Sequence, residues 1–181
     1  MKRTTVLLAE DHTIVREGIR KMIEMEADLE VVGEAKNGQE AVAMVKELHP
    51  ALVLMDVSMP LLNGFQATRQ ILEAVPATKV IMLSAYNDEA YVEEATNSGA
   101  MGYLIKQTST GSVCHAIREV QKGKTFFSPS ISSHLRKRNG KKRMDGVGFQ
   151  VGKSLAASLL AFRPETRRRS VLRVKRGLVA S

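Results

Sequence analysis

The sequence predicts an α/β fold: a doubly wound, five-stranded parallel sheet followed by a basic C-terminal tail. Short apolar runs alternate five times with segments of helical periodicity between residues 4 and 123, a rhythm typical of β-α units. Most of these runs are continuous, as in strands that are covered on both faces. A sharp change of charge separates the tail. Helices are expected on both faces of the sheet, because parallel strands need crossover connections.

The five predicted strands are rich in aliphatic and β-branched residues, which favour extended chain. The first reads TTVLLA, and the third, ALVLMDV, is the run that ends on Asp56 before the turn at Pro60. The strands are expected at residues 4–9, 31–35, 51–57, 79–85 and 102–106.

Five helices are predicted between and after these strands, at residues 12–26, 37–49, 65–75, 88–99 and 112–123. The second begins with Asn37 and Glu40, three residues apart as in a capping box. Helical spacing gives the residues expected to face the sheet. In the first helix they are Ile14, Gly18, Ile19, Met22 and Ile23, and in the second they are Ala41, Val42, Val45 and Leu48.

Charge divides the chain into two parts. Residues 1–122 hold 12 Lys and Arg against 17 Asp and Glu, a net charge of −5, whereas residues 123–181 hold 15 against 2, a net charge of +13. We interpret residues 1–122 as one domain, residues 123–143 as a linker and residues 144–181 as a basic tail.

The composition indicates whether the protein associates with a membrane and in which compartment it is found. No stretch approaches the roughly 20 apolar residues that span a bilayer, so no membrane association is expected. The N-terminal apolar run VLLA is too short for the core of a signal peptide. Cys114 is the single cysteine, which excludes an internal disulfide and suits a reducing compartment. A cytoplasmic location is expected.

Polar residues stand at the ends of four predicted strands. The first strand leads into Glu10 and Asp11, and the third, fourth and fifth end at Asp56, Ser84 and Lys106. In open parallel sheets the carboxyl ends of the strands form the functional edge. These side chains are therefore expected to converge there.

Such a set of side chains suits phosphoryl transfer. Carboxylates held close together repel one another unless a cation joins them, and oxygen ligands with no His or Cys among them favour Mg²⁺. An Asp carboxylate can itself act as the nucleophile and form an aspartyl phosphate. Mg²⁺ and Lys106 would neutralise the phosphoryl oxygens, and the Ser84 hydroxyl would donate a hydrogen bond to them. Asp56 is the candidate phosphoacceptor.

Four motifs together resemble the CheY-like receiver domain of two-component response regulators: AEDH, LVLMDVSMPLLNG, VIMLSAY and GYLIK. The resemblance covers roughly residues 3–122 and implies a flavodoxin-like strand order, 2-1-3-4-5. It implies a phosphorelay in which a histidine kinase phosphorylates Asp56. Mg²⁺ would then be held by Glu10, Asp11, Asp56 and the backbone carbonyl of Ser58, with Lys106 and Ser84 gripping the phosphoryl group.

The resemblance also implies a switch. Tyr103 matches the aromatic position that swings inward as Ser84 moves toward the phosphoryl group. The surface around the fourth helix and fifth strand would then pair with another receiver, forming a homodimer, or release an output segment. The Glu-Asp pair and the segment FFSPSIS resemble the NarL/FixJ (LuxR-type) subfamily of transcription regulators. Gln107 departs from the cis proline found there in many receivers.

The basic tail does not match the rest of that subfamily, in which a linker leads to a helix-turn-helix DNA-binding domain. Residues 144–181 contain no stretch that reads as its scaffold and recognition helices, so sequence-specific DNA binding is not expected. We interpret the tail as a truncated or frame-shifted remnant of the output domain. The alternative is a selected module that attracts nucleic acid by neutralising phosphates.

Three other functions are consistent with parts of the sequence. A stand-alone receiver would act as a phosphoryl sink without DNA-binding output. An aspartate-nucleophile phosphohydrolase would need a second Asp two residues after Asp56, where this chain has Ser58. A flavin-binding module would need a hydroxyl-rich phosphate loop where this chain has the acids of EDHT. A regulator rather than an enzyme is therefore expected.

Overall fold

The computed structural model describes residues 3–107 and 110–128. Residues 144–181 and most of the predicted linker lie outside them. One parallel sheet contains β1 (Thr4–Ala9), β2 (Leu29–Ala35), β3 (Leu52–Asp56), β4 (Lys79–Ser84), β5 (Gly102–Ile105) and β6 (Phe126–Phe127). Its order is β2-β1-β3-β4-β5-β6. The predicted order 2-1-3-4-5 is confirmed, and β6 adds a short sixth strand at the edge.

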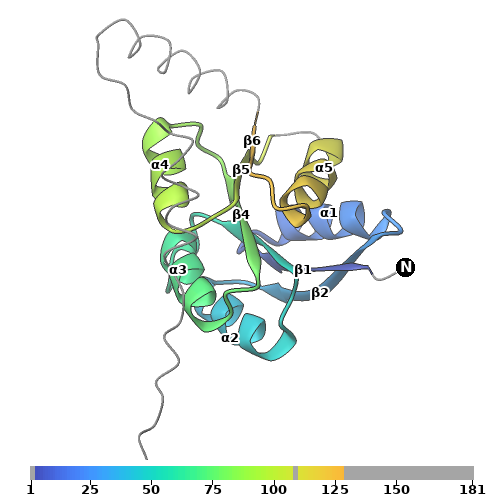
Figure 1. The fold of residues 1–181 in the computed structure, drawn as a ribbon, viewed down its shortest axis with the longest axis horizontal. Coiled ribbons are helices and arrows are strands. Elements are labelled where there is room, and N and C mark those ends of the chain that lie inside the picture. The colour runs from blue at the N-terminus through green and yellow to red at the C-terminus, as the bar shows by residue number, and fades with distance from the viewer. Residues whose placement is uncertain (1–2, 108–109, 129–181) are drawn as a thin grey trace, which may run out of the picture. The chain divides into compact units, whose positions relative to one another are not determined.

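Helices cover both faces of the sheet, as predicted (Figure 1). They are α1 (Thr13–Glu24), α2 (Gly38–Leu48), α3 (Gly64–Ala74), α4 (Glu89–Asn97) and α5 (Thr110–Gln121). Among the described residues, no helix combines the length and the apolar character needed to cross a membrane.

Two apolar cores lie on opposite sides of the sheet, because successive strand residues point to opposite faces. In β1, Val6 and Leu8 pack into the core beneath α1 and α5, whereas Leu7 and Ala9 pack into the core beneath α2, α3 and α4. All five residues of β3 are buried. The central strands are therefore rigidly embedded up to their carboxyl ends, where the polar residues begin.

The start of α2 confirms the predicted capping box. The Asn37 side chain accepts a hydrogen bond from the backbone N–H of Glu40 at 2.9 Å. The Glu40 carboxylate in turn accepts the backbone N–H of Lys36 at 2.8 Å. The first bond satisfies an N–H group that the helix start leaves without a partner, and the second holds the residue before the N-cap Asn37.

The predicted inward faces of α1 and α2 need correction. Ile14 is 87% exposed and Leu48 is 40% exposed, and Gly18 is also exposed. The buried residues of α1 are Arg16, Ile19 and Ile23, which are spaced three and four apart. Ile14 lies two residues from Arg16, about 200° around the helix, and therefore points away from the sheet.

The sixth strand lies in the segment predicted as a linker. Phe126 and Phe127 pair in parallel with Gly102 and Tyr103 of β5. Their partly buried rings pack against opposite cores, Phe126 beneath α1 and α5 and Phe127 beneath the other three helices. The compact unit therefore continues past the end of α5 to at least residue 127.

Candidate functional site

The carboxyl ends of the four central strands stand level with one another. Register pairs Ala9 with Met55, Asp56 with Leu83, and Ser84 with Ile105. Glu10, Asp11 and Lys106 follow β1 and β5 directly. The predicted strand-end residues are therefore brought to one edge of the sheet, as the rule for parallel sheets requires.

Three carboxylates converge at this edge, and we call them the acidic cluster: Glu10, Asp11 and Asp56. One ligand atom from each lies within 4.8 Å of the others, and a nitrogen of His12 belongs to the same group. Glu10 and Asp56 are each 1% exposed, whereas the Asp11 side chain is 29% exposed and His12 is 65% exposed. The carboxylates of Glu10 and Asp56 are thus buried, and that of Asp11 is partly exposed to solvent.

Lys106 joins the two buried carboxylates. Its Nζ lies 2.8 Å from Asp56 Oδ2, and 2.8 and 3.0 Å from the two oxygens of Glu10. The backbone N–H of Lys106 donates to the carbonyl of Ser84 at 2.8 Å. This bond fixes the root of the lysine against β4, so its ammonium reaches the acidic cluster from a defined direction.

Three oxygens of the acidic cluster have ion-pair contacts but no well-aligned hydrogen bond. The buried oxygens Glu10 Oε2, Asp11 Oδ1 and Asp56 Oδ2 accept no hydrogen bond of acceptable geometry, although each has a cationic or basic nitrogen close by. Buried carboxylate oxygens left in this way are costly. Oxygen ligands with open positions suit a hard divalent cation. The residues present therefore fit such an ion.

The charges of the site shift its protonation equilibria. Burial, reinforced by the charge of Glu10, raises the pKa of Asp56 against the opposing effect of Lys106. Burial works against the charged form of Lys106, but Asp56 and Glu10 outweigh it and raise its pKa. The hydrogen bond to Glu10 and then the charge of Asp11 raise the pKa of His12. The lysine accordingly stays positive beside the carboxylates.

The loop after β3 presses closely on Asp56. The backbone N–H of Ser58 donates to Asp56 Oδ1 at 3.2 Å, and the N–H of Gly64 donates to the carbonyl of Val57 at 3.0 Å. A Cβ at Gly64 would lie 2.1 Å from the Asp56 carbonyl oxygen. Only glycine allows this approach. The role predicted for the Ser58 carbonyl stays a prediction.

Ser84 and Tyr103 are connected through one loop. The Ser84 hydroxyl accepts the backbone N–H of Tyr86 at 3.0 Å, and the hydroxyl of Tyr103 donates to the carbonyl of Tyr86 at 2.9 Å. Both side chains are buried, and burial raises the pKa of Tyr103. A movement of Ser84 would therefore pull on the loop that holds the Tyr103 hydroxyl.

Two residues at the site were missed by the sequence analysis. His12 stands beside the acidic cluster, with Nδ1 2.8 Å from Asp11 Oδ1 and 3.0 Å from Glu10 Oε1, so the expectation of a site without His was wrong. Arg16 is 6% exposed and donates to the carbonyl of Glu10 at 2.8 Å. Its spacing from Ile19 and Ile23 was the available signal, because it places a basic residue on the buried face.

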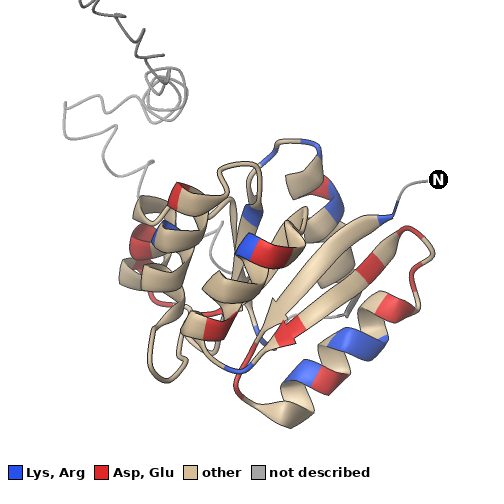
Figure 2. Ribbon diagram, turned by 90° about the horizontal axis from the view of Figure 1, so that it is seen from below, with Lys and Arg blue, Asp and Glu red and all other residues tan. Residues whose placement is uncertain are grey.

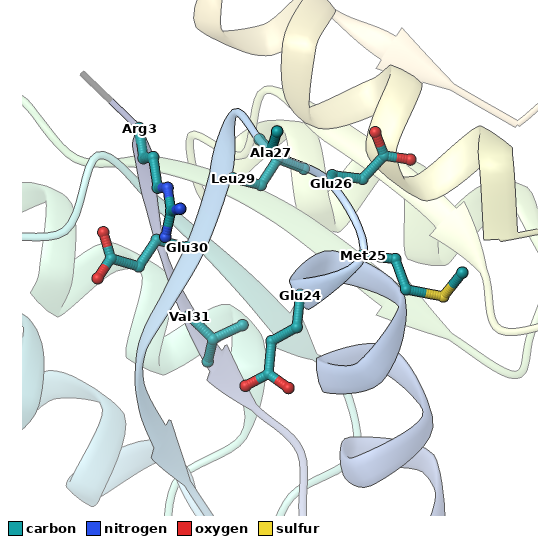
Figure 3. A pocket seen from close by; sticks show the side chains of 8 residues that line it. All are labelled: Arg3, Glu24, Met25, Glu26, Ala27, Leu29, Glu30 and Val31. Carbon is teal, nitrogen blue, oxygen red and sulfur yellow. The ribbon is translucent and has the colours of Figure 1, made fainter. Parts of the chain in front are cut away.

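A hollow of about 480 Å³ lies away from this edge. Its walls come from the residue before β1, the end of α1, the connection that follows it and the start of β2 (Figure 3). The lining residues are Arg3, Glu24, Met25, Glu26, Ala27, Leu29, Glu30 and Val31. It shares no residue with the acidic cluster.

Comparison with known sequences points to one family. The profile of the response regulator receiver domain matches residues 6–118. The chain is 35% identical over 130 residues to the transcriptional regulatory protein DegU of Brevibacillus brevis, covering 72% of this chain and 55% of DegU. It is 37% identical over 137 residues to the response regulator VraR of Staphylococcus aureus, covering 76% and 66%. The chain thus spans between half and two thirds of these relatives.

Solved structures show the same fold. A LuxR-family two-component response regulator from Aurantimonas sp. SI85-9A1 superposes with a TM-score of 0.73 at 31% identity, covering 76% of this chain and 98% of that one. The isolated REC domain of RcsB from Salmonella enterica serovar Typhimurium, solved with the phosphomimetic BeF3⁻, gives 0.68 at 28% identity, covering 73% and 98%.

Proposed function

Since this chain belongs to the response regulator receiver family, we propose that it accepts a phosphoryl group on Asp56 from a histidine kinase. One observation supports this most strongly. Asp56 is buried at the open edge of the sheet, with the Lys106 ammonium 2.8 Å from its Oδ2. One oxygen of each carboxylate in the acidic cluster accepts no hydrogen bond of acceptable geometry. That combination suits a nucleophile that must receive a strongly charged group.

The reaction needs little beyond positioning and charge. A carboxylate oxygen of Asp56 attacks phosphorus, and the bond from phosphorus to the kinase histidine nitrogen breaks, leaving its electron pair on that nitrogen. Lys106 moves its ammonium from the carboxylates toward the phosphoryl oxygens, and the Ser84 hydroxyl donates to another. The N–H of Ser58, already on Asp56 Oδ1, holds the acceptor carboxylate in orientation.

We place Mg²⁺ at the acidic cluster, held by Glu10, Asp11, Asp56 and the Ser58 carbonyl. When bound, the ion neutralises the developing charge on the phosphoryl oxygens. Asp11 provides the ligand nearest solvent, because its side chain is 29% exposed. His12 lies close enough to contribute, but the hard ligands around it favour an ion that prefers oxygen.

The output is regulatory rather than enzymatic in this proposal. Phosphorylation shifts Ser84 and the loop that holds Tyr103, and so changes the surface between α4 and β5. DegU carries the name of a transcriptional regulatory protein and VraR that of a response regulator, which supports control of transcription. We further propose a cytoplasmic location and a receiver homodimer. The basic tail would add salt-sensitive contact with DNA. The phosphohydrolase alternative needs a general acid two residues after Asp56. Ser58 occupies that position, and its hydroxyl cannot act as the acid.

The test uses beryllofluoride, which occupies the place of a phosphoryl group. We expect the chain to bind it only with Mg²⁺ present, detected by ¹⁹F NMR as a bound signal. Asp56→Asn removes the acceptor charge and should abolish the signal. The matched control is Asp88→Asn. The Asp88 carboxylate caps α4 by accepting the N–H of Ala90, and the bound signal should remain in this variant. A bound signal in the Asp56 variant, or none in the parent chain, would reject the proposal.

A further inference from the structure

Arg16 places a buried guanidinium against the backbone of the acidic cluster. It is 6% exposed, and its Nη1 donates to the carbonyl oxygen of Glu10 at 2.8 Å in a buried hydrogen bond. Arginine is seldom buried without well-placed partners. The guanidinium therefore binds inside the protein, to the peptide group that joins Glu10 to Asp11.

Glu34 of β2 supplies the charge partner of this guanidinium. Arg16 Nε donates to Glu34 Oε2 at 3.0 Å, and Arg20 pairs with the other oxygen of the same carboxylate. Figure 2 shows acidic and basic positions mixed along α1, where both arginines lie. Arg20 is half exposed and bonds to Glu24 and Glu34, whereas Arg16 also bonds to the carbonyl of Glu10. The chain thus contains a natural control for Arg16.

The backbone of Glu10 is held from two sides. Its N–H donates to the carbonyl of Ala35 at 3.0 Å, and its carbonyl accepts from Arg16. That carbonyl belongs to the planar peptide unit joining Glu10 to Asp11. Fixing this unit sets the directions in which both side chains leave the chain, and both belong to the acidic cluster.

We propose that Arg16 is a positioning residue for cation binding, acting through the peptide between Glu10 and Asp11. It contacts the backbone and is not itself a ligand. The inference rests on the proposed function, since the cation concerned is the one required for phosphoryl transfer. Outer partners that orient metal ligands typically change metal affinity by about 10- to 100-fold.

The test measures Mg²⁺ affinity of the full chain by titration calorimetry. Arg16→Met keeps the apolar stem and removes all donors, and we expect affinity to fall about tenfold. Arg20→Met removes the half-exposed ion pairs of Arg20 with Glu24 and Glu34. Its Mg²⁺ affinity should stay within about twofold of the parent chain, because exposed ion pairs contribute little. Arg16→Lys keeps the positive charge but on a single nitrogen, which cannot bond to the Glu10 carbonyl and to Glu34 as the two guanidinium nitrogens do, so an intermediate loss is expected.

Thermal unfolding in EDTA separates this role from a merely structural one. A structural role would lower the unfolding midpoint without weakening Mg²⁺ binding by the folded protein. If the parent chain binds no Mg²⁺, the proposed function fails. If the parent binds and the folded Arg16 variants match it, only the role of Arg16 is overturned. Should Arg16→Met not fold, Arg16→Lys decides alone, and parental affinity in it overturns the inference.

Discussion

At the scale of residues, burial makes Asp56 sensitive to protons. Its pKa is raised by burial and by Glu10, and a cation ligand must be deprotonated to bind. Protonation therefore competes with Mg²⁺ as the pH falls, and it begins at a higher pH than for an exposed Asp. We expect Mg²⁺ affinity to decrease as the pH falls, and the decrease to begin at a higher pH than an exposed Asp would set, measured by calorimetry at several pH values. Asp56→Asn should flatten this dependence; an equally steep profile in that variant would contradict it.

Gly64 is the residue on which the shape of the loop depends most. A Cβ there would overlap the Asp56 carbonyl oxygen at 2.1 Å, so backbone must shift. We expect Gly64→Ala to lower the free energy of unfolding by about 2–4 kcal/mol, measured by urea denaturation. Gly18, exposed in α1 with nothing within 4 Å of its Cβ position, is the matched control. Gly18→Ala should be neutral or stabilise by up to about 1 kcal/mol. Equal effects of the two substitutions would refute the steric account.

The site residues were predictable to different degrees. Asp56, Glu10 and Lys106 could be predicted because each follows an apolar strand, and parallel strands bring their carboxyl ends together. Arg16 could not be found by that rule, since it lies inside a helix and acts through a backbone carbonyl. His12 was passed over because the rule gives the edge but not the direction of each side chain.

At the scale of elements, β6 connects the end of α5 to the strand that carries Tyr103. Ser128 follows it and is 2% exposed; its N–H donates to the carbonyl of Tyr103 at 3.0 Å, and its hydroxyl accepts the N–H of Ile105 at 3.1 Å. These bonds hold β5 on both sides of Leu104. The first residues after α5 are therefore packed against the sheet and lie next to Tyr103, the proposed switch residue.

A truncation series tests this role of β6. A chain ending at residue 128 should be more stable than one ending at residue 122 by about 2–4 kcal/mol, because the longer chain partly buries two phenylalanines and keeps the bonds of Ser128. Urea denaturation measures the difference. In the longer chain, Ser128→Ala should lose about 1 kcal/mol of that added stability, because the hydroxyl that accepts the N–H of Ile105 is removed. Equal midpoints for the two chains would show that β6 adds nothing.

The elements themselves were largely predictable, with two instructive failures. Long periodic segments such as α5 and continuous apolar strands such as β3 leave a clear pattern. A strand as short as β6 has no periodicity to detect, and the Ser-Pro that follows it favours a turn or linker. In α1, Ile19 and Ile23 are buried as predicted, but Ile14 and Gly18 are exposed and Arg16 occupies an inward position instead.

At the scale of the whole molecule, charge is the feature that divides the chain. The net charge is −5 over residues 1–122 and +13 over residues 123–181. We expect the full chain to bind duplex DNA of any sequence, and a chain ending at residue 128 to bind far more weakly. Affinity should fall by at least about tenfold between 50 and 200 mM salt, measured by fluorescence anisotropy. Binding that is unaffected by salt, or retained by the shorter chain, would contradict this expectation.

The parallel sheet suits the proposed coupling of Asp56 phosphorylation to the molecular surface. Strand ends bring the acidic cluster, Lys106 and Ser84 to one edge. Tyr86, which bonds to Ser84 and Tyr103, stacks on Tyr91 of α4, and Ser128 after β6 bonds to Ile105 beside Lys106. The buried strands are stiff, so a charge placed on Asp56 is relieved by movement of the loops rather than of the sheet.

The most direct test of phosphoryl acceptance is to incubate the full chain with acetyl phosphate and Mg²⁺, trap the acyl phosphate with borohydride, and map the modified residue by peptide mass spectrometry. We predict one modified residue, Asp56, with modification lost in EDTA and strongly reduced in Lys106→Met. Modification of Glu10 or Asp11 instead, or none on Asp56 while Mg²⁺ binds normally, would contradict the account.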